Sequence, residues 1–212
     1  MRIGILGAGG MADALGGQWA RAGHEIMVSS RDAGKAAALA RRIGPAAGAG
    51  SFTEAAGFGE AVLVAIRYEG VLDVVRTAAP ALAGKAVIDC VNPVDQGVLL
   101  NEGGPSAARQ IAEAAPGARV VKAFNLCHEN VWRMTPPVFG GRALAVPVCG
   151  DDPAATELTR RLVRDLGCDP LDGGGLARAD LLEATAAFMI GLWFAGADAQ
   201  AVLPPLTHAF GS

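Results

Sequence analysis

Residues 2–12 read Arg-Ile-Gly-Ile-Leu-Gly-Ala-Gly-Gly-Met-Ala, and this stretch decides the fold class. Its first five residues are mostly apolar and predict a β-strand. The spacing G-x-G-x-x-A follows directly and opens the next predicted helix at Gly10. A strand, a glycine-rich turn and a helix in this order are typical of the first unit of a dinucleotide-binding fold.

Each residue of this turn has a chemical task in such a fold. Gly7 permits the tight turn, and Gly9 lets the backbone approach a pyrophosphate closely. Gly10 and Met11 begin a helix whose free N–H groups point at the phosphates. The small Ala12 allows the helix and the strand to pack closely. The sequence therefore predicts that the turn binds the pyrophosphate of a dinucleotide.

The end of the second predicted strand indicates which dinucleotide is bound. An acidic residue there usually accepts hydrogen bonds from the ribose hydroxyls of NAD. Here the chain has Ser29, Ser30 and Arg31, followed by Lys35. Hydroxyl groups and cations suit a 2′-phosphate, because a guanidinium donates forked, charge-assisted hydrogen bonds to it. These residues predict a preference for NADP(H), which Asp32 would oppose if its carboxylate turned inward.

Apolar runs of strand length alternate with helical patterns along most of the chain. The runs are continuous, which indicates burial on both faces of a parallel sheet. The predicted fold is α/β, a Rossmann-type, doubly wound and mostly parallel sheet. The expected strands are 2–6, 25–29, 61–66, 85–89, 119–123 and 144–149, and the expected helices are 10–22, 33–43, 51–58, 70–79 and 107–115.

This alternation becomes less regular after residue 123. One more strand and helix (144–149 and 153–167), a short strand (169–172) and a long apolar helix (176–196) predict a small C-terminal α/β extension. We expect an NADP-binding Rossmann core at 1–125. Residues 126–212 would then form an extension that closes an acceptor pocket, within one compact domain overall.

The composition excludes several classes of protein. Hydrophobic residues make up 51% of the chain, which excludes a disordered protein. A net charge of −3 without a basic cluster argues against a nucleic-acid partner. The apolar run 184–197 is too short to span a membrane and predicts a buried helix. No metal is expected, and the cysteines are expected to be small buried hydrophobes in a reducing cytoplasm: Cys90, Cys127, Cys149 and Cys168.

Two further stretches carry a family resemblance. They are Val-Lys-Ala-Phe-Asn at 121–125 and Val-Cys-Gly-Asp-Asp at 148–152. Together with the glycine turn and Ser30-Arg31, they resemble the F420-dependent NADP oxidoreductase family over nearly the whole chain. The same set is similar to the cytosolic reductase domain of the STEAP metalloreductases. The resemblance implies a Rossmann sheet with a small C-terminal lobe, and hydride transfer between NADP(H) and the deazaflavin coenzyme F420.

The resemblance also implies where the cofactors lie. By position, Gly9, Gly10 and Met11 match the phosphate turn of the family, and Ser30 and Arg31 match its 2′-phosphate site. The nicotinamide half of NADP would lie at residues that follow later strands, where an open α/β sheet binds its ligands. These residues are Ile66, Arg67, Asn92, Pro93, Ala123 and Asn125.

Departures from the family pattern fall on the acceptor side, at Arg67, Leu126 and 173–176. NADP is therefore better supported than F420. Arg67 could pair with an acidic coenzyme tail, or it could be a solvated loop residue. His128 could donate a proton to an imine or carbonyl substrate, or it could cap a helix.

Three other functions stay open. An imine or ketone reductase, related to pyrroline-carboxylate reductases or hydroxyacid dehydrogenases, would use the same N-terminal unit. A flavin or ferric reductase would fit the similarity to the STEAP domain. A regulator that senses NADPH could use the same fold without catalysis.

The C-terminal helix predicts a homodimer. Between 181 and 203 it is apolar nearly all round, with Phe188, Ile190, Trp193 and Phe194 among its side chains. A second copy would cover such a patch, which is rare on the surface of a monomer. The alternative is an internal helix of a monomer.

Overall fold

The structure, a computed structural model, describes residues 1–197. Its centre is a single sheet of eight strands: β1 (Arg2–Leu6), β2 (Glu25–Ser29), β3 (Ala47–Gly50), β4 (Ala61–Val64), β5 (Ala86–Asp89), β8 (Arg119–Lys122), β11 (Ala145–Gly150) and β12 (Asp169–Gly174). Their order is β12-β11-β8-β5-β4-β1-β2-β3. The strands from β8 to β3 are parallel, whereas β11 runs antiparallel to β8 and carries β12 parallel to itself. The predicted Rossmann-type α/β fold is confirmed.

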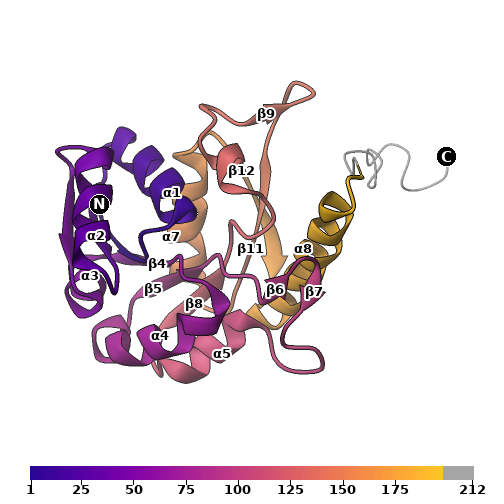
Figure 1. Cartoon of the computed structure of the whole chain (residues 1–212), viewed down its shortest axis with the longest axis horizontal. Coiled ribbons are helices and arrows are strands. Elements are labelled where there is room, and N and C mark those ends of the chain that lie inside the picture. The colour runs from indigo at the N-terminus through magenta and orange to yellow at the C-terminus, as the bar shows by residue number, and fades with distance from the viewer. Residues whose placement is uncertain (198–212) are drawn as a thin grey trace.

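Helices cover both faces of this sheet (Figure 1). One face packs under α1 (Gly10–Arg21), α2 (Ala33–Ile43) and α7 (Pro153–Arg164). The other face packs under α3 (Phe52–Phe58), α4 (Tyr68–Leu82) and α5 (Ala107–Ala114). The chain proceeds from β1 to β3 towards one edge and then returns to build β4 and β5 on the opposite side of β1. A crevice therefore opens where β1 and β4 end, and ligands of open α/β sheets bind at such a switch point.

Several expected helix ends are confirmed by their caps. Ser51 and Glu54 form a capping box at the start of α3, with hydrogen bonds of 3.2 Å and 2.7 Å. Asp152 caps α7 by accepting from the backbone N–H of Ala155 at 2.8 Å. Gly23 and Gly44 follow α1 and α2 with positive φ angles of 89° and 116°, which favour glycine.

The structure corrects other boundaries. The strand expected at 61–66 ends at Val64, and the helix expected at 70–79 runs from Tyr68 to Leu82. Strand β3 was missed because its sequence, Ala-Gly-Ala-Gly, lacks the large apolar residues that mark a strand. The helix expected at 176–196 begins as a 3₁₀ turn, Leu176–Arg178, and becomes α8 (Ala179–Phe194).

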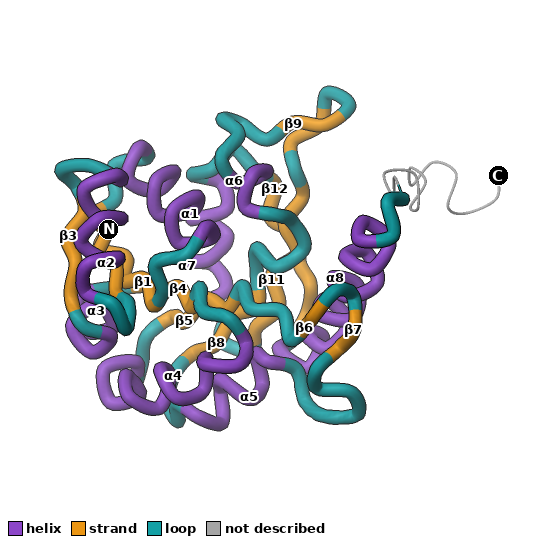
Figure 2. Tube along the Cα trace, in the orientation of Figure 1, coloured by secondary structure: helices purple, strands orange, loops and turns teal. Residues whose placement is uncertain are grey.

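Helix α8 lies beside the sheet rather than inside it, as Figures 1 and 2 show. One of its faces is buried through Ala179, Glu183, Ala186 and Ala187. The opposite face is exposed, with 57% of Leu181 and 61% of Phe188 accessible. The prediction of a buried helix is therefore wrong within the described residues, and residues 198–203 of the predicted apolar segment lie outside them.

Two short hairpins complete the described chain. One pairs β6 (Val94–Asp95) with β7 (Val98–Leu99), and the other pairs β9 (Val138–Phe139) with β10 (Arg142–Ala143). The first hairpin packs on α8 through glycines, because a Cβ at Gly97 would overlap the backbone of Gly191. In Figure 2 the second hairpin and α8 extend from the body at separate positions. No helix within residues 1–197 has the length and apolarity needed to cross a bilayer.

Candidate functional site

The glycine turn after β1 takes the conformation that the sequence predicts. Gly7 has a φ of 130°, and a Cβ at this position would overlap the carbonyl oxygen of Ala65. Its N–H donates to the carbonyl oxygen of Ser29 at 3.0 Å, which ties the turn to the end of β2. Only glycine fits this position, because both the backbone angle and the close contact exclude a side chain.

The start of α1 is open to a ligand. Gly9 is its N-cap residue and offers no side-chain hydrogen bond, so the first N–H groups of the helix have no capping partner in the side chains. A Cβ at Gly9 would meet no other atom within 4 Å. A cavity of about 280 Å³ lies here, lined by Gly9, Gly10, Met11, Ala65, Ile66, Arg67, Tyr68, Cys90, Val91, Asn92 and Glu129. Its position suits an anion held by a helix N-terminus.

Glu129 is a residue of this cavity that sequence reasoning missed. It begins α6 (Glu129–Trp132), and its carboxylate lies directly against the Cα of Gly10. Arg133 approaches Glu129 at 3.8 Å and Asp13 of α1 at 3.1 Å. A pyrophosphate at this turn would therefore meet an acidic side chain. No local sequence pattern signals this contact, because residues 10 and 129 meet only through the fold.

At the end of β2 the predicted residues take different roles. Ser29 is fully buried, and its hydroxyl donates to the carbonyl oxygen of Ile5 at 2.9 Å. Ser30 accepts from the N–H of Asp32 at 3.2 Å. Asp32 accepts from the N–H of Lys35 at 3.1 Å, so its carboxylate serves as the N-cap of α2. The hydroxyl of Ser29 therefore faces the sheet, whereas Ser30 lies at the open end of the strand.

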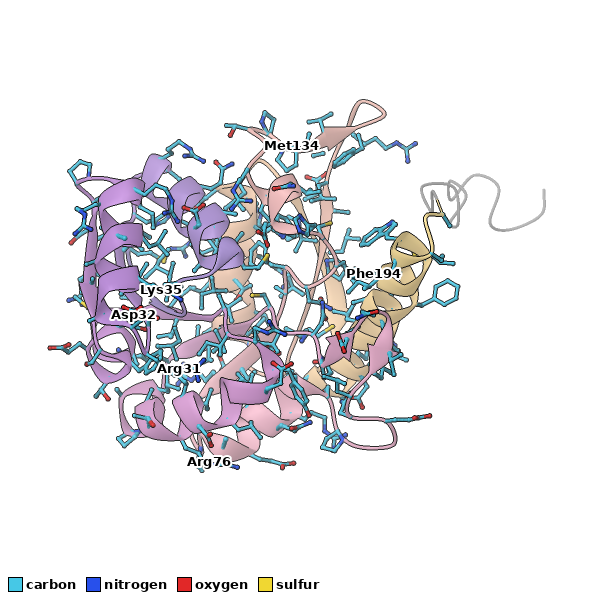
Figure 3. All side chains as sticks on the ribbon, viewed as in Figure 1. Arg31, Asp32, Lys35, Arg76, Met134 and Phe194 are labelled. Atoms are coloured by element: carbon cyan, nitrogen blue, oxygen red, sulfur yellow. The ribbon has the colours of Figure 1, made fainter. Side chains whose placement is uncertain are left out.

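Arg31 and Lys35 are exposed, and neither forms an ion pair with any of residues 1–197. In Figure 3 they lie together with Asp32 at the end of β2, on the side of the molecule opposite Phe194 of α8. Two exposed cations beside a serine hydroxyl form a surface suited to a phosphate group.

A larger cavity of about 460 Å³ lies beside the first and has mostly apolar walls. It is lined by Asn92, Asn125, Leu126, Cys127, His128, Ile190, Trp193 and Phe194. Asn92 lines both cavities. The amide of Asn92 donates to the carbonyl oxygen of Asn125 at 2.7 Å, and Asn125 donates back to Asn92 Oδ1 at 3.0 Å. This pair of amides therefore joins the ends of β5 and β8 at the boundary between the cavities.

The structure brings together four of the six residues predicted for the nicotinamide half. Ile66, Arg67, Asn92 and Asn125 line one or both cavities. Ala123 instead lies in the core, and Pro93 supports the β6–β7 hairpin by accepting from the N–H of Leu100. Arg67 is 90% exposed and lies 3.5 Å from Glu69, which is the arrangement of a solvated loop residue.

Phe124 fixes the loop that carries Asn125. It has a φ of 64°, which is unfavourable for a residue with a side chain. Its ring packs edge-on against Trp19 and Trp132, with centroid distances of 5.8 Å and 5.3 Å. These contacts hold the backbone in the left-handed conformation and aim Asn125 at the cavities.

A buried charge cluster lies beneath the Asn pair. Lys122 is fully buried, and its ammonium group lies 2.9 Å from Asp89 and 2.7 Å from Glu183. Burial alone would lower the pKa of Lys122, but the two carboxylates outweigh it and raise this pKa above its usual value. Burial raises the pKa of Glu183, although Lys122 opposes the rise. The motif at 121–125 contains Lys122, but the sequence alone did not assign it a role.

The remaining candidates are also placed. His128 is the N-cap of α6, where Nδ1 accepts from the N–H of Asn130 at 3.3 Å. Burial raises the pKa of Cys90 to about 12 and that of Cys127 to about 11. All four cysteines are free, and all but the half-buried Cys127 are buried as expected. Residues 1–197 contain no group of three metal-ligating side chains.

The fold and the glycine turn are those of the Rossmann-type dinucleotide-binding proteins. Residues 2–93 match the model of the family described as NADP oxidoreductase coenzyme F420-dependent. The family resemblance inferred from the sequence is therefore confirmed.

Individual relatives agree with this assignment. Metalloreductase STEAP3 of Rattus norvegicus is 31% identical over 91% of this chain, which spans only 38% of STEAP3. F420-dependent NADP reductase of Methanothermobacter marburgensis is 29% identical over 91% of this chain and 92% of its own length. A solved structure of a putative F420-dependent NADP reductase from Arthrobacter sp. FB24 superposes with a TM-score of 0.77 and 28% identity, covering 92% of this chain and 95% of that one.

Proposed function

We propose that this protein is an oxidoreductase that transfers a hydride between NADP(H) and the deazaflavin coenzyme F420. This proposal rests mainly on the pair of adjoining cavities that share Asn92. One cavity adjoins the phosphate turn and would take the nicotinamide half of the nucleotide. The other is broad and apolar and would take a flat ring system. Hydride transfer needs two carbons roughly 3–3.5 Å apart, and adjoining cavities allow such stacking.

The protein's own groups supply position and exclusion of water rather than acid–base chemistry. The cofactors carry the hydride themselves. Asn92 and Asn125 are uncharged donors and acceptors at the junction of the cavities. Ile190 and Trp193 form apolar walls. This arrangement fits a reaction between two redox rings, which requires no catalytic acid.

The preference for NADP(H) rests on Ser30, Arg31 and Lys35 at the end of β2. We expect Arg31→Ala to weaken NADPH binding roughly 10- to 100-fold, because a hydrogen bond to a charged group contributes about 1.5–3 kcal/mol. NADH binding should change less than twofold. Arg41→Ala is the matched control, because it removes an exposed arginine of α2 further from the turn. Equal affinity of the wild type for both nucleotides would contradict the assignment.

The acceptor is tested by the loss of NADPH absorbance with F420, a free flavin, a ferric chelate, a cyclic imine and a ketone. Turnover with F420 that clearly exceeds the other rates is the expected result. Fast turnover of the imine without F420 turnover would favour the imine reductase, and preference for the flavin or the chelate would favour a flavin or ferric reductase. NADPH binding without turnover of any acceptor would favour a sensing regulator.

A substitution of His128 distinguishes an F420 reductase from an imine or ketone reductase. It lines the larger cavity, and a proton donor is needed for an imine or carbonyl substrate but not for F420. We expect His128→Gln to leave the kcat with F420 within twofold. A loss above tenfold would show that a proton transfer at His128 limits the reaction.

We also propose that the protein is a cytoplasmic homodimer. The exposed apolar face of α8, with Leu181 and Phe188, would be covered by the same face of a second copy. Light scattering should give about twice the chain mass of 21.5 kDa. A mass near 21.5 kDa that is unchanged by NADPH would refute the dimer.

A further inference from the structure

The Asp89–Lys122–Glu183 cluster joins three segments that are distant in the sequence. Asp89 ends β5, Lys122 ends β8, and Glu183 comes from the second turn of α8. All three side chains are buried, with 0–2% of each accessible. Two carboxylates and one ammonium group in such a place are costly unless their hydrogen bonds are satisfied.

Each partner of Lys122 makes further hydrogen bonds. Asp89 accepts from the N–H of Val91 at 2.8 Å. Glu183 accepts from the N–H groups of Ala107 and Ala108 at 2.9 Å and 3.3 Å, at the start of α5. Lys122 also donates to the carbonyl oxygen of Val91. The cluster is therefore fully connected, and it fixes one point of α8 on the sheet.

The same segments continue into the larger cavity. Val91 directly precedes Asn92, and Lys122 lies three residues before Asn125. Asn125 donates to the carbonyl oxygen of Leu182, the residue next to Glu183. Further along α8, Ile190 and Trp193 form the apolar wall of this cavity. The Asp89–Lys122–Glu183 cluster thus connects the Asn92–Asn125 pair, at the junction of the cavities, with the apolar wall formed by Ile190 and Trp193.

The other polar contacts of α8 also lie in its N-terminal half. Asp180 accepts from the N–H of Ser106 at 2.9 Å and lies 3.6 Å from Arg109. Further along the helix, Gly191 approaches the backbone of Gly97 in the β6–β7 hairpin. Ala186 and Ala187 bury only small side chains. Asp180 and Arg109 are partly exposed, whereas Glu183 and Lys122 are buried, so Glu183 makes the buried charged contact that places α8 and its wall of the cavity.

We infer that Lys122 and Glu183 are positioning residues of the acceptor cavity: their ion pair sets the distance of α8 from the Asn92–Asn125 pair, and so the width of the cavity. This inference rests on the proposed function in taking the larger cavity as the acceptor site. Asp89 and Lys122 also contact Val91, which lines the smaller cavity, whereas Glu183 links the cluster to α8. Loss of Glu183 leaves the contacts with Val91 in place, so it should affect acceptor binding far more than NADP(H) binding.

The test compares three variants of the holoenzyme. Glu183→Leu removes the ion pair while Lys122 keeps Asp89, and Glu183→Gln keeps an oxygen that can accept from Lys122. Ser106→Ala is the control for stability, because its hydroxyl caps the same start of α5 without touching Lys122. We expect Glu183→Leu to raise the KM for F420 at least tenfold, with the Kd for NADPH within twofold. Glu183→Gln should stay within threefold of the wild type, and Ser106→Ala should lower only the Tm.

A second measurement needs no acceptor. Amide hydrogen exchange of residues 186–194 should accelerate at least tenfold in Glu183→Leu and remain near the wild type in Ser106→Ala. If F420 is not a substrate, this exchange still decides whether the pair positions α8. Unchanged exchange, or unchanged KM together with normal F420 turnover, would overturn the inference and leave the proposed function standing. An equal rise in the Kd for NADPH would also overturn it.

Discussion

We expect the replacement of Gly9 by alanine to weaken NADPH binding without lowering the stability of the fold. Gly9 has a φ of −90° and a ψ of −169°, which any residue adopts. A Cβ at this position would meet no atom within 4 Å. The substitution should therefore leave the free energy of unfolding unchanged or raise it by about 0.4–1 kcal/mol, because alanine restricts the unfolded chain.

The same methyl group would stand where the pyrophosphate approaches the backbone. Moving the phosphates away from the N–H groups of α1 loses at least one charge-assisted hydrogen bond, worth about 1.5–3 kcal/mol. At about 1.4 kcal/mol for each factor of ten, NADPH should bind roughly 10- to 100-fold more weakly. Titration of NADPH by fluorescence and unfolding in urea measure the two effects separately.

Gly7→Ala provides the contrast within the same turn. Its φ of 130° and the contact with Ala65 put the new methyl group into backbone atoms. We expect a loss of stability of at least about 1–3 kcal/mol. The reasoning is refuted if Gly9→Ala binds NADPH as tightly as the wild type, or if it loses as much stability as Gly7→Ala.

Two further predictions concern charges. Lys122→Met should lower the free energy of unfolding, measured in urea, by about 3–5 kcal/mol, because two buried carboxylates lose their cation. Adding Glu183→Gln to this variant should recover part of the loss. A loss below about 1 kcal/mol in Lys122→Met would contradict the stabilising role of the cluster. Burial tends to raise the pKa of Asp13, but Arg42 and Arg133 outweigh it and hold this pKa below 3.8. Asp13 thus stabilises the fold above pH 4, and its contribution is lost as the pH falls through the lowered pKa. The stability difference between wild type and Asp13→Asn, about 0.5–1 kcal/mol at pH 7, should shrink progressively as the pH falls below about 4.

Local chemistry made much of the fold predictable. The glycine turn, the capping box at Ser51 and the helix ends at Gly23 and Gly44 depend on residues close in sequence, and all appear in the structure. Continuous apolar runs marked the central strands because both faces of a parallel sheet are covered. Strand β3 (47–50) escaped because an exposed edge strand of alanine and glycine carries no hydrophobic pattern.

The site was only partly predictable, because several of its contacts join distant residues. Nothing near Glu129 indicates that its carboxylate lies against Gly10. The buried cluster did leave a trace in the sequence. Asp89 ends an otherwise apolar strand, and Lys122 directly follows two valines at the end of another. A charge at such a buried position needs a partner of opposite sign. Pairing these two residues would have been a sound prediction from the sequence alone.

The hydrophobicity of helix α8 does not indicate which of its faces packs against the sheet. Its apolar residues surround the helix, so no stripe indicates which side meets the sheet. The side that meets it carries small alanines and Glu183, while Leu181 and Phe188 face outward. An acidic residue in the middle of an apolar helix must be either solvated or paired, and here a buried lysine on a neighbouring strand pairs it. The buried face is thus set by a specific charge partner and by close backbone contact, and the large apolar side chains are left to line the cavity and the outer surface.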